Sequence, residues 1–495
     1  MADQAYIETQ VEKIRQLSVE RATRTWKQHT RGERVSFADL NDSLSRIVSD
    51  DRLLQAIEDE MAAGPEPLRQ RELKLLRSLV LEGRITQHPD VQALHTRLVE
   101  YHLHVRATVD GQAVSAAQLQ RTLAFNPDRD ARRAAYEAYA QISAGAAADL
   151  TAFIKKLNEL SRAAGYSDYY RFTLAQDDID PQFLHDSLQT FKAASLAPAT
   201  VAADAMAAFL EVDPLEPWDV PFAKQVLMND LDEYFPADNA VPSLRRTLAA
   251  IGIDIDALPV TVDTEPQDSK TYAAFCFAIN PPADVRVTAN PLPGIGFYMR
   301  LYHEFGHALH AVCNRQNRWI FLREPACFSE GMANILSALI REPEWLSRNT
   351  NLKPHQLQRL DLLHGILAFD RRDSLARVAF ELSAYHDPDR DLDAIHHERV
   401  CEYSLTPNPA GLSIWAASPL YASHPAYLHN YFLGAMIAAQ TIAHLKRSGR
   451  ELFTPATGQF LIESYYAPGR SIPWTEKVRR ATGESLSASH LLTGD

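Results

Sequence analysis

The sequence predicts a mainly α protein with one small β-sheet. Apolar residues recur at spacings of three and four over most of the chain, which is the pattern of amphipathic helices. Short β-branched or aromatic runs bounded by Pro, Asp or Asn are confined to about 258–291. The chain has 495 residues, of which 46% are hydrophobic and 23% charged, so it has ample apolar material for a core.

The first half of the chain is expected to be helical. Residues 5–110 contain successive amphipathic runs such as "VEKIRQLSVERATRTW", and residues 115–210 continue them. The alanine-rich "ISAGAAADLTAFIKKLNEL" is expected to be helix rather than linker, because alanine is the best helix former. The prolines of "VDPLEPWDVPF" (212–222) mark the first strong break. We therefore expect an N-terminal helical half over 1–230.

The second half, 231–495, is expected to carry the sheet and to pack with the first half as one unit. Three strand-like runs, "LPVTVD", "TYAAFCFAI" and "DVRVTANP", make up the segment at about 258–291. A helix is predicted directly after it, over about 296–313, and helical patterns continue to the C-terminus.

Composition and charge exclude several classes of function. The formal net charge of −13 argues against nucleic acid, because phosphate binding needs a surplus of lysine and arginine. No run approaches the roughly 18 apolar residues of a membrane span, and "MADQAYIETQVEKIRQ" lacks the apolar core of a signal peptide. The four cysteines are far apart and form no C-x-x-C pair, which is typical of reduced thiols. We expect a cytoplasmic protein with no membrane partner.

The stretch "RLYHEFGHALHAVC" contains the pattern H-E-x-x-H. On a helix, His303 and His307 share a face with Cβ atoms roughly 5–6 Å apart, which suits two imidazoles on one metal ion. Glu304 is offset by about 100° and can reach a water on that ion without being a ligand. The alternative is an ordinary buried helix that contains histidines, since Leu301 and Phe305 lie at buried-helix spacing.

A third ligand decides between these interpretations, and "REPACFSEGMANILSALI" offers Glu324 and Glu330. Glu330 is favoured because it begins a helix-like run, in which Asn334 lies one turn on and can hydrogen-bond a ligating histidine. Glu324 precedes a proline and is expected on a loop. The zinc class that takes a third histidine from the same segment is excluded because His310 stands where it needs glycine. His310 is expected to support a ligand or to pack in the core.

Three protein ligands leave the fourth tetrahedral position to water, which is typical of a catalytic zinc. Zinc lowers the pKa of such a water to about 7, and Glu304 can then accept its proton as general base. The motif therefore predicts hydrolysis, with one Zn²⁺ per chain; Mn²⁺ and Co²⁺ remain alternatives.

"YHEFGHALHA", followed by "REPACFSEGMANILSAL", resembles the gluzincin peptidases related to oligoendopeptidase F, thimet oligopeptidase and angiotensin-converting enzyme. The stretches "LNELSRAAGYSDYYRFTL", "LEPWDVPF", "KTYAAFCFAI" and "GRSIPWTEKVRRATGESLSAS" are similar to other parts of those enzymes and fall in the same order. The likeness runs over most of the chain from about 150. It implies an elongated helical ellipsoid split by a deep channel that admits short peptides, with zinc at its floor beside a small β-sheet.

Carried onto this sequence, the resemblance matches His303, His307 and Glu330 to the zinc ligands and Glu304 to the base. It also implies that the edge of the small sheet, at Ala273 and Ala274, binds the substrate backbone by strand addition.

"YASHPAYLHNYFLGA" carries the next match. The resemblance implies that Tyr431 donates a hydrogen bond to the oxyanion of the tetrahedral intermediate, with Tyr427 as a further catalytic candidate. The related enzymes place a histidine about ten residues earlier, and here that position is Tyr421, which is expected to contact substrate. His424 or His429 can take the place of that histidine after a local shift.

The leading hypothesis is a cytosolic zinc endopeptidase that cleaves short peptides. Residues 411–431 contain no lysine or arginine to hold a terminal carboxylate, which weakens the carboxydipeptidase version. Two alternatives stay open: a zinc hydrolase of the same fold that acts on a non-peptide amide or a dedicated small molecule, and a non-catalytic binding protein.

Overall fold

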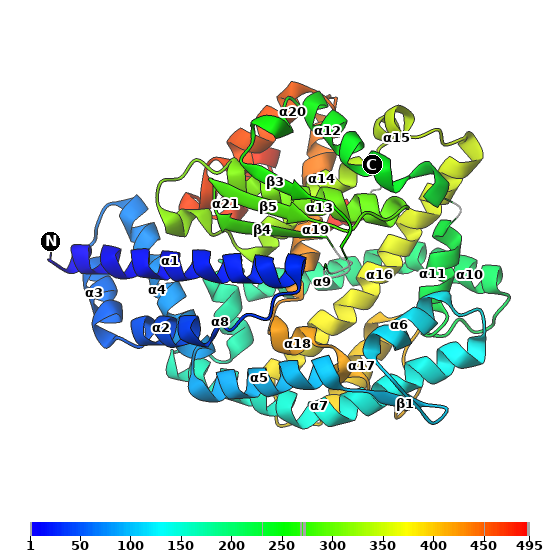
Figure 1. The fold of residues 1–495 in the computed structure, drawn as a ribbon, viewed down its shortest axis with the longest axis horizontal. Helices are drawn as coiled ribbons and strands as arrows, with labels where there is room; N and C mark the ends of the chain where they lie inside the picture. The colour runs from blue at the N-terminus through cyan, green and yellow to red at the C-terminus, as the bar shows by residue number, and fades with distance from the viewer. Residues whose placement is uncertain (1, 230, 268–269, 271–273, 450, 493–495) are drawn as a thin grey trace.

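A computed structural model describes residues 2–229, 231–267, 270, 274–449 and 451–492, which excludes position 1, the last three residues and a few internal positions. Over this part of the chain most residues are helical and the strands form two small sheets, which confirms the mainly α fold class (Figure 1). All four cysteines are free.

The N-terminal part of the chain is a succession of helices. Several begin at an aspartate whose side chain accepts a hydrogen bond from a backbone N–H of the first turn, as Asp128 does from Asp130. The helices are α1 (Ala2–Arg31), α2 (Ala38–Val48), α3 (Asp51–Ala62), α4 (Pro67–Thr86), α5 (Pro89–His104), α6 (Ala116–Phe125), α7 (Arg129–Ala163), α8 (Tyr169–Gln176), α9 (Pro181–Ala194), α10 (Leu196–Leu210) and α11 (Val220–Asn229).

A β-hairpin interrupts this helical half, so the prediction that strands are confined to about 258–291 is wrong. Strands β1 (Ala107–Val109) and β2 (Gln112–Val114) pair antiparallel. Asp110 and Gly111 form the turn with positive φ values of 50° and 77°, the conformation that favours Asp-Gly in two-residue hairpin loops. Each strand has three residues, too few to show an alternating pattern.

The predicted sheet consists of β3 (Val260–Asp263), β4 (Phe275–Asn280) and β5 (Asp284–Thr288) in the order β3-β5-β4. Strand β5 pairs parallel with β3 and antiparallel with β4, so β4 is an edge strand. Figure 1 shows α1 running alongside β4, where the Trp26 ring contacts the Phe277 ring at a centroid distance of 5.5 Å.

The helix predicted at about 296–313 is α13 (Ile295–Val312), which follows the sheet directly. Helix α16 crosses the molecule diagonally in Figure 1. The other helices of this half are α12 (Ala240–Ala250), α14 (Ala326–Leu339), α15 (Pro343–Asn349), α16 (Pro354–His386), α17 (Leu392–Tyr403), α18 (Leu420–Ser423), α19 (His429–Arg447), α20 (Pro455–Leu461) and α21 (Trp474–Thr482).

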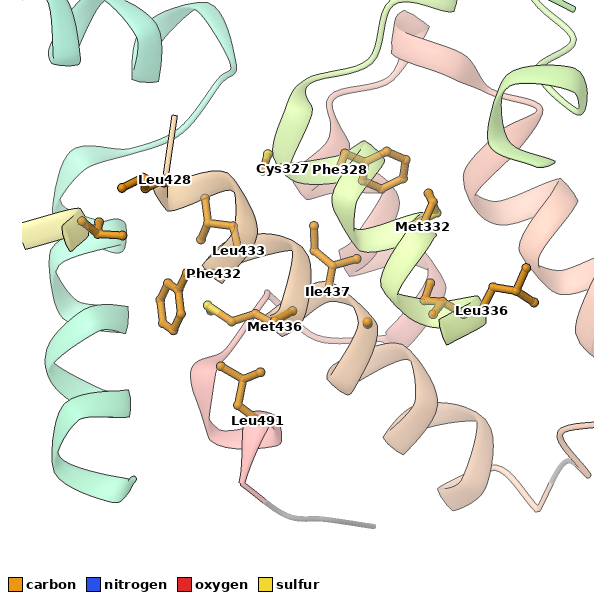
Figure 2. Close-up of a cluster of buried hydrophobic side chains, with 14 of the residues drawn as sticks. Cys327, Phe328, Met332, Leu336, Leu428, Phe432, Leu433, Met436, Ile437 and Leu491 are labelled. Atoms are coloured by element: carbon orange, nitrogen blue, oxygen red, sulfur yellow. The ribbon is translucent and has the colours of Figure 1, made fainter. Parts of the chain in front are cut away.

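Helix α14 packs between α13 and α19 in the largest hydrophobic core. Figure 2 shows apolar side chains of α14 and α19 in this core, among them Met332 and Ile437, which are both fully buried. The same core includes side chains from both halves of the chain, for example Leu157 of α7 and Leu301 of α13. The division of the chain at about 230 stays a prediction.

Within the described residues, no single helix combines the length and hydropathy needed to cross a membrane. The bent pair α9 and α10 meets that criterion jointly, by length and composition only.

Candidate metal centre

The structure brings His303 and His307 of α13 together with Glu330 of α14. The three potential ligand atoms lie within 4.8 Å of one another. The Nε2 atom of His303 is 3.4 Å from Oε2 of Glu330, and the two imidazole rings have a centroid distance of 4.8 Å. One helical turn separates the histidines, so the α-helix itself sets this spacing.

Two glycines let the helices approach closely enough for this geometry. A Cβ atom at Gly306 of α13 would lie 2.5 Å from the Cα atom of Ala333 on α14. A Cβ atom at Gly434 of α19 would lie 2.6 Å from the Cβ atom of Glu330. Since the overlapped atoms are backbone and Cβ atoms, larger residues would force the helices apart. Gly306 and Gly434 therefore help to place Glu330 opposite the two histidines.

Hydrogen bonds fix both imidazoles. The Nδ1 atom of His303 is 3.1 Å from Oδ1 of Asn334, and Nδ1 of His307 is 2.9 Å from Oγ of Ser329. Because Oδ1 of Asn334 can only accept, Nδ1–H of His303 donates to it, which leaves the Nε2 lone pair free to bind a metal; donation from Nδ1–H of His307 to Ser329 would free its Nε2 in the same way. The sequence predicted the Asn334 contact. It did not predict Ser329, and the only available signal was the position of Ser329 next to Glu330 on α14.

These residues fit a divalent metal ion. The Oε2 atom of Glu330 is buried and has no hydrogen-bond partner among the described residues, while Oε1 accepts a bond of 3.1 Å from the Tyr427 hydroxyl. A buried carboxylate oxygen without a partner is unfavourable unless a cation binds it. Two imidazole nitrogens and one carboxylate oxygen form a set that catalytic zinc sites use.

The electrostatics of Glu330 and His307 favour ligation, whereas the contact with Glu330 outweighs burial and raises the pKa of His303. Burial alone would raise the pKa of Glu330, but His303 and His307 outweigh it and hold that pKa below its usual value. Burial lowers the pKa of His307 to about 4. Glu330 is therefore ionised and His307 neutral near pH 7, which are the states in which these groups bind metal.

Glu304 lies next to this cluster. Its Oε2 atom accepts a 2.8 Å hydrogen bond from the backbone N–H of Cys276 on β4, which fixes the carboxylate relative to the sheet edge. Burial raises the pKa of Glu304 to about 7, although the nearby charge of His303 opposes the shift.

The expected channel is present as a cavity of about 960 Å³. Glu304, His307 and Glu330 line this cavity, together with residues of β4 such as Phe275 and Cys276. Residues of α1 and α4 also line it, as do Ser423 to Tyr427 from the segment before α19. The cluster is thus accessible to a ligand that occupies the cavity.

The structure places Tyr427 and Tyr431 beside the cluster. Their rings have a centroid distance of 5.3 Å, and Tyr427 donates to Glu330 as described above. Burial and the charge of Glu330 raise the pKa of both tyrosines, so both hydroxyls keep their protons near pH 7. Tyr431 is 46% exposed, which leaves its hydroxyl available to a ligand. His424 lines the cavity with its ring 5.3 Å from that of Tyr427.

Two other candidates are buried and contact other side chains, although His429 also lines the large cavity. Tyr421 is buried, with its ring against those of Phe380 and Trp415 at centroid distances of 5.5 and 6.3 Å. His429 is also buried, and its Nδ1 atom lies 3.0 Å from the Tyr170 hydroxyl.

His310 turns towards Glu324, with 3.8 Å between Nε2 and Oε1. Glu324 lies on the expected loop between the 3₁₀ segment Trp319–Leu322 and α14, and its carboxylate pairs with Lys477. Glu324, the other candidate for the third metal ligand, is therefore already paired with Lys477.

Ala274 is buried just before β4, and Ala273 lies outside the described residues.

A smaller cavity of about 280 Å³ adjoins the cluster on its other side, and its walls include His303, Glu330 and Tyr431. Arg371 and Arg377 of α16 also line it. Sequence reasoning missed both arginines because it searched for a cation only near Tyr431. The available signal was the recurrence of arginine in "FDRRDSLAR", within a helix that is otherwise largely buried.

Comparison with solved structures finds a similar protein, described as Trypanosoma cruzi metallocarboxypeptidase 1. The two chains superpose with a TM-score of 0.66 at 15% sequence identity, over 99% of this chain and 98% of the other. The two proteins share a fold. No protein-family model matches the chain, and no curated protein matches its sequence.

Proposed function

We propose that this protein is a zinc-dependent peptidase that hydrolyses short peptides. The observation that carries the proposal is the cluster of His303, His307 and Glu330, whose free nitrogen and carboxylate atoms converge beside Glu304 in a large cavity. The similar fold of a protein described as a metallocarboxypeptidase supports it. So does the resemblance of the two motif stretches to gluzincin peptidases.

His303, His307 and Glu330 would hold the metal through two Nε2 atoms and Oε2. When bound, a zinc ion acidifies water and polarises a carbonyl group as a Lewis acid. Glu304 faces the same cavity and, with a pKa near 7, can accept a proton from the attacking water and later donate it to the leaving amine. The Cys276 N–H holds the Glu304 carboxylate at the sheet edge during these transfers.

Tyr431 and Tyr427 supply neutral hydroxyl donors beside the cluster. A phenol that donates to the developing oxyanion stabilises the transition state more than the ground state, which contributes about 10²–10³ in rate in comparable sites. Tyr427 already donates to Glu330, so its main role is to orient that carboxylate. Tyr431 is the more exposed of the two and is the proposed oxyanion donor.

The edge strand β4 is the proposed binding surface for the peptide backbone. Its residues line the large cavity, and pairing through main-chain groups gives affinity with little dependence on the side chains of the substrate. Ala274 directly precedes this strand, and the role of Ala273, which lies outside the described residues, stays a prediction.

Cavities on both sides of the cluster favour an oligopeptidase-type endopeptidase. The large cavity can take one part of a peptide, and the small cavity, which shares lining residues with a further cavity of about 670 Å³, can take the other. A peptide that crosses the metal site therefore has space beyond the cleaved bond in both directions.

A carboxypeptidase is the second candidate. Arg371 and Arg377 line the small cavity beside His303 and Tyr431, where a guanidinium group could bind the terminal carboxylate of a peptide. The name of the structurally similar protein favours the same activity.

Product mapping by mass spectrometry on a peptide library tests the proposal and separates the two candidates. Each peptide is offered with a free C-terminal carboxylate and as its C-terminal amide, with zinc-loaded and chelator-treated protein. We expect zinc-dependent cleavage of both forms at internal bonds. Cleavage restricted to the last bonds of the free acids would establish the carboxypeptidase, and absence of any cleavage by zinc-loaded protein would refute both.

A further inference from the structure

A cavity of about 670 Å³ adjoins the small cavity beside the metal site. Asn334, Arg371 and Ala435 line both this cavity and the small cavity beside His303 and Glu330. Its other walls come from α10, α13, α14, α16, α19 and the C-terminal residues. Residues of α14 thus line both the small cavity and this one.

Positive charges outnumber negative charges among the described residues that line this cavity. The described residues that line it include three cations, Arg341, Arg371 and Lys446, and a single carboxylate, that of Glu342. Glu342 pairs with Lys446, with 3.0 Å between Oε2 and Nζ. Two arginines are left facing the cavity in excess of the available negative charge.

Neither arginine has a carboxylate within ion-pair distance among the residues that the structure describes. Asp370, next to Arg371 in sequence, instead binds Lys224 through both oxygens, at 2.8 and 3.0 Å. The Nε atom of Arg341 is buried and finds no hydrogen-bond partner within the described part of the chain. Burial and the charge of Arg341 lower the pKa of Arg371 to about 10, and burial lowers that of Arg341.

Arg341 and Arg371 are both half-buried, so water solvates their guanidinium groups less well than on an open surface, and a bound anion would stabilise them. Charged side chains that the fold leaves without a partner are typical of binding sites. A planar guanidinium recognises a carboxylate through two parallel hydrogen bonds, which suits it to an aspartate or glutamate side chain.

We propose that Arg341 and Arg371 form a subsite for an acidic side chain of the peptide substrate. This inference rests on the proposed peptidase function and adds a substrate class, peptides with Asp or Glu on one side of the cleaved bond. It differs from the carboxypeptidase candidate, because Arg341 lines the distal cavity and not the small cavity beside the metal residues.

The geometry limits where the acidic residue lies. Arg341 follows the end of α14, and a rise of 1.5 Å per residue places it about 16 Å along the axis from Glu330. The arginine and glutamate side chains span part of that length, and an extended peptide advances about 3.4 Å per residue. We therefore expect the acidic residue about two to four positions from the cleaved bond.

The test compares peptide pairs that differ only by Glu or Gln at each position around a fixed cleavage site. For the wild type we expect kcat/KM to favour Glu over Gln by about 10- to 100-fold at one position, as for hydrogen bonds to a charged group. Arg341→Gln should bring this ratio close to 1, and Arg341→Lys should retain part of it. General damage to the enzyme would lower kcat/KM for the Glu and Gln peptides alike, so a change in their ratio is specific to the subsite.

Arg315→Gln is the matched control, since it removes the same charge from an exposed residue that pairs with Glu463 outside the cavity. It should leave the Glu/Gln ratio unchanged. A wild-type ratio near 1 at every position, or a ratio that survives Arg341→Gln, would overturn the subsite. A preference that follows only the C-terminal carboxylate would also overturn it and assign Arg371 to the carboxypeptidase candidate.

A second readout does not depend on turnover. Zinc-loaded Glu304→Gln protein is titrated with fluorescently labelled Glu and Gln peptides, and dissociation constants are measured by fluorescence anisotropy. Tighter binding of the Glu peptide, lost when Arg341→Gln is added, supports the subsite even if no hydrolysis is found. Equal dissociation constants contradict the subsite whether or not the wild type hydrolyses peptides.

Discussion

Replacing Gly434 by alanine is expected to weaken metal binding although Gly434 is not one of the metal-binding residues. The new Cβ atom would lie 2.6 Å from the Cβ atom of Glu330 and 2.9 Å from the backbone nitrogen of Gly331. Ordinary contacts begin at about 3.4 Å, so α19 and α14 must separate by about 0.8 Å. Overpacking of this kind costs about 1–3 kcal/mol of stability.

The displacement matters for the metal because ligand distances must stay within about 0.2 Å of their ideal values. A shift of Glu330 by several tenths of an ångström would exceed that tolerance, and we expect zinc affinity to fall by at least tenfold. Competition with a chromogenic chelator measures the affinity, and thermal unfolding in excess chelator measures the stability of the metal-free protein.

Gly296→Ala is the matched control. Gly296 lies near the start of α13, and a Cβ atom there would meet nothing within 4 Å among the described residues. Alanine should raise stability there by about 0.5–1 kcal/mol through helix propensity and leave zinc affinity unchanged. Wild-type zinc affinity in the Gly434→Ala protein would refute the argument that close helix packing positions Glu330.

Four further predictions concern the site and its surroundings. Glu304→Gln should retain one zinc per chain by metal analysis and lower kcat by about 10²–10⁴, and unchanged turnover would remove Glu304 as the base. Tyr431→Phe should lower kcat more than it changes KM in steady-state kinetics, whereas an effect on KM alone would make it a binding residue. Ser329→Ala and Asn334→Ala should each weaken zinc binding by about 10- to 100-fold in chelator competition, and wild-type affinity in both would contradict the roles assigned to their hydrogen bonds. Burial raises the pKa of Glu381 to about 8 in the folded protein, so its contribution to stability is complete below pH 4.5 and is lost as pH rises through 8. The melting temperature of the wild type should therefore fall relative to that of Glu381→Gln between pH 5 and 8.5. Parallel curves of melting temperature against pH would contradict this.

The helical period made the central part of the site predictable from the sequence. Because residues four apart on a helix share a face, the positions of His303 and His307 required only that α13 exist. Asn334 followed in the same way once Glu330 was chosen on α14. The choice of Glu330 over Glu324 rested on the proline after Glu324, and the structure adds the pairing of Glu324 with Lys477.

The remaining features depend on tertiary contacts that no local pattern encodes. Arg371 and Arg377 reach the site from α16, and Ser329 meets His307 across the contact between α13 and α14. The place of Tyr421 in a motif suggested substrate contact, which stays a prediction; the structure shows its ring packed against Phe380 in the core. The hairpin of β1 and β2 was missed because its strands are too short to alternate, although Asp-Gly is a known hairpin signal.

The most direct test of the account is the metal content of purified wild-type and Glu330→Ala proteins, measured by inductively coupled plasma mass spectrometry after equilibration with zinc and removal of excess ion. The account predicts one zinc per wild-type chain and a large loss in Glu330→Ala. A wild-type protein that holds no stoichiometric divalent metal, or a Glu330→Ala protein that holds as much as the wild type, would contradict it.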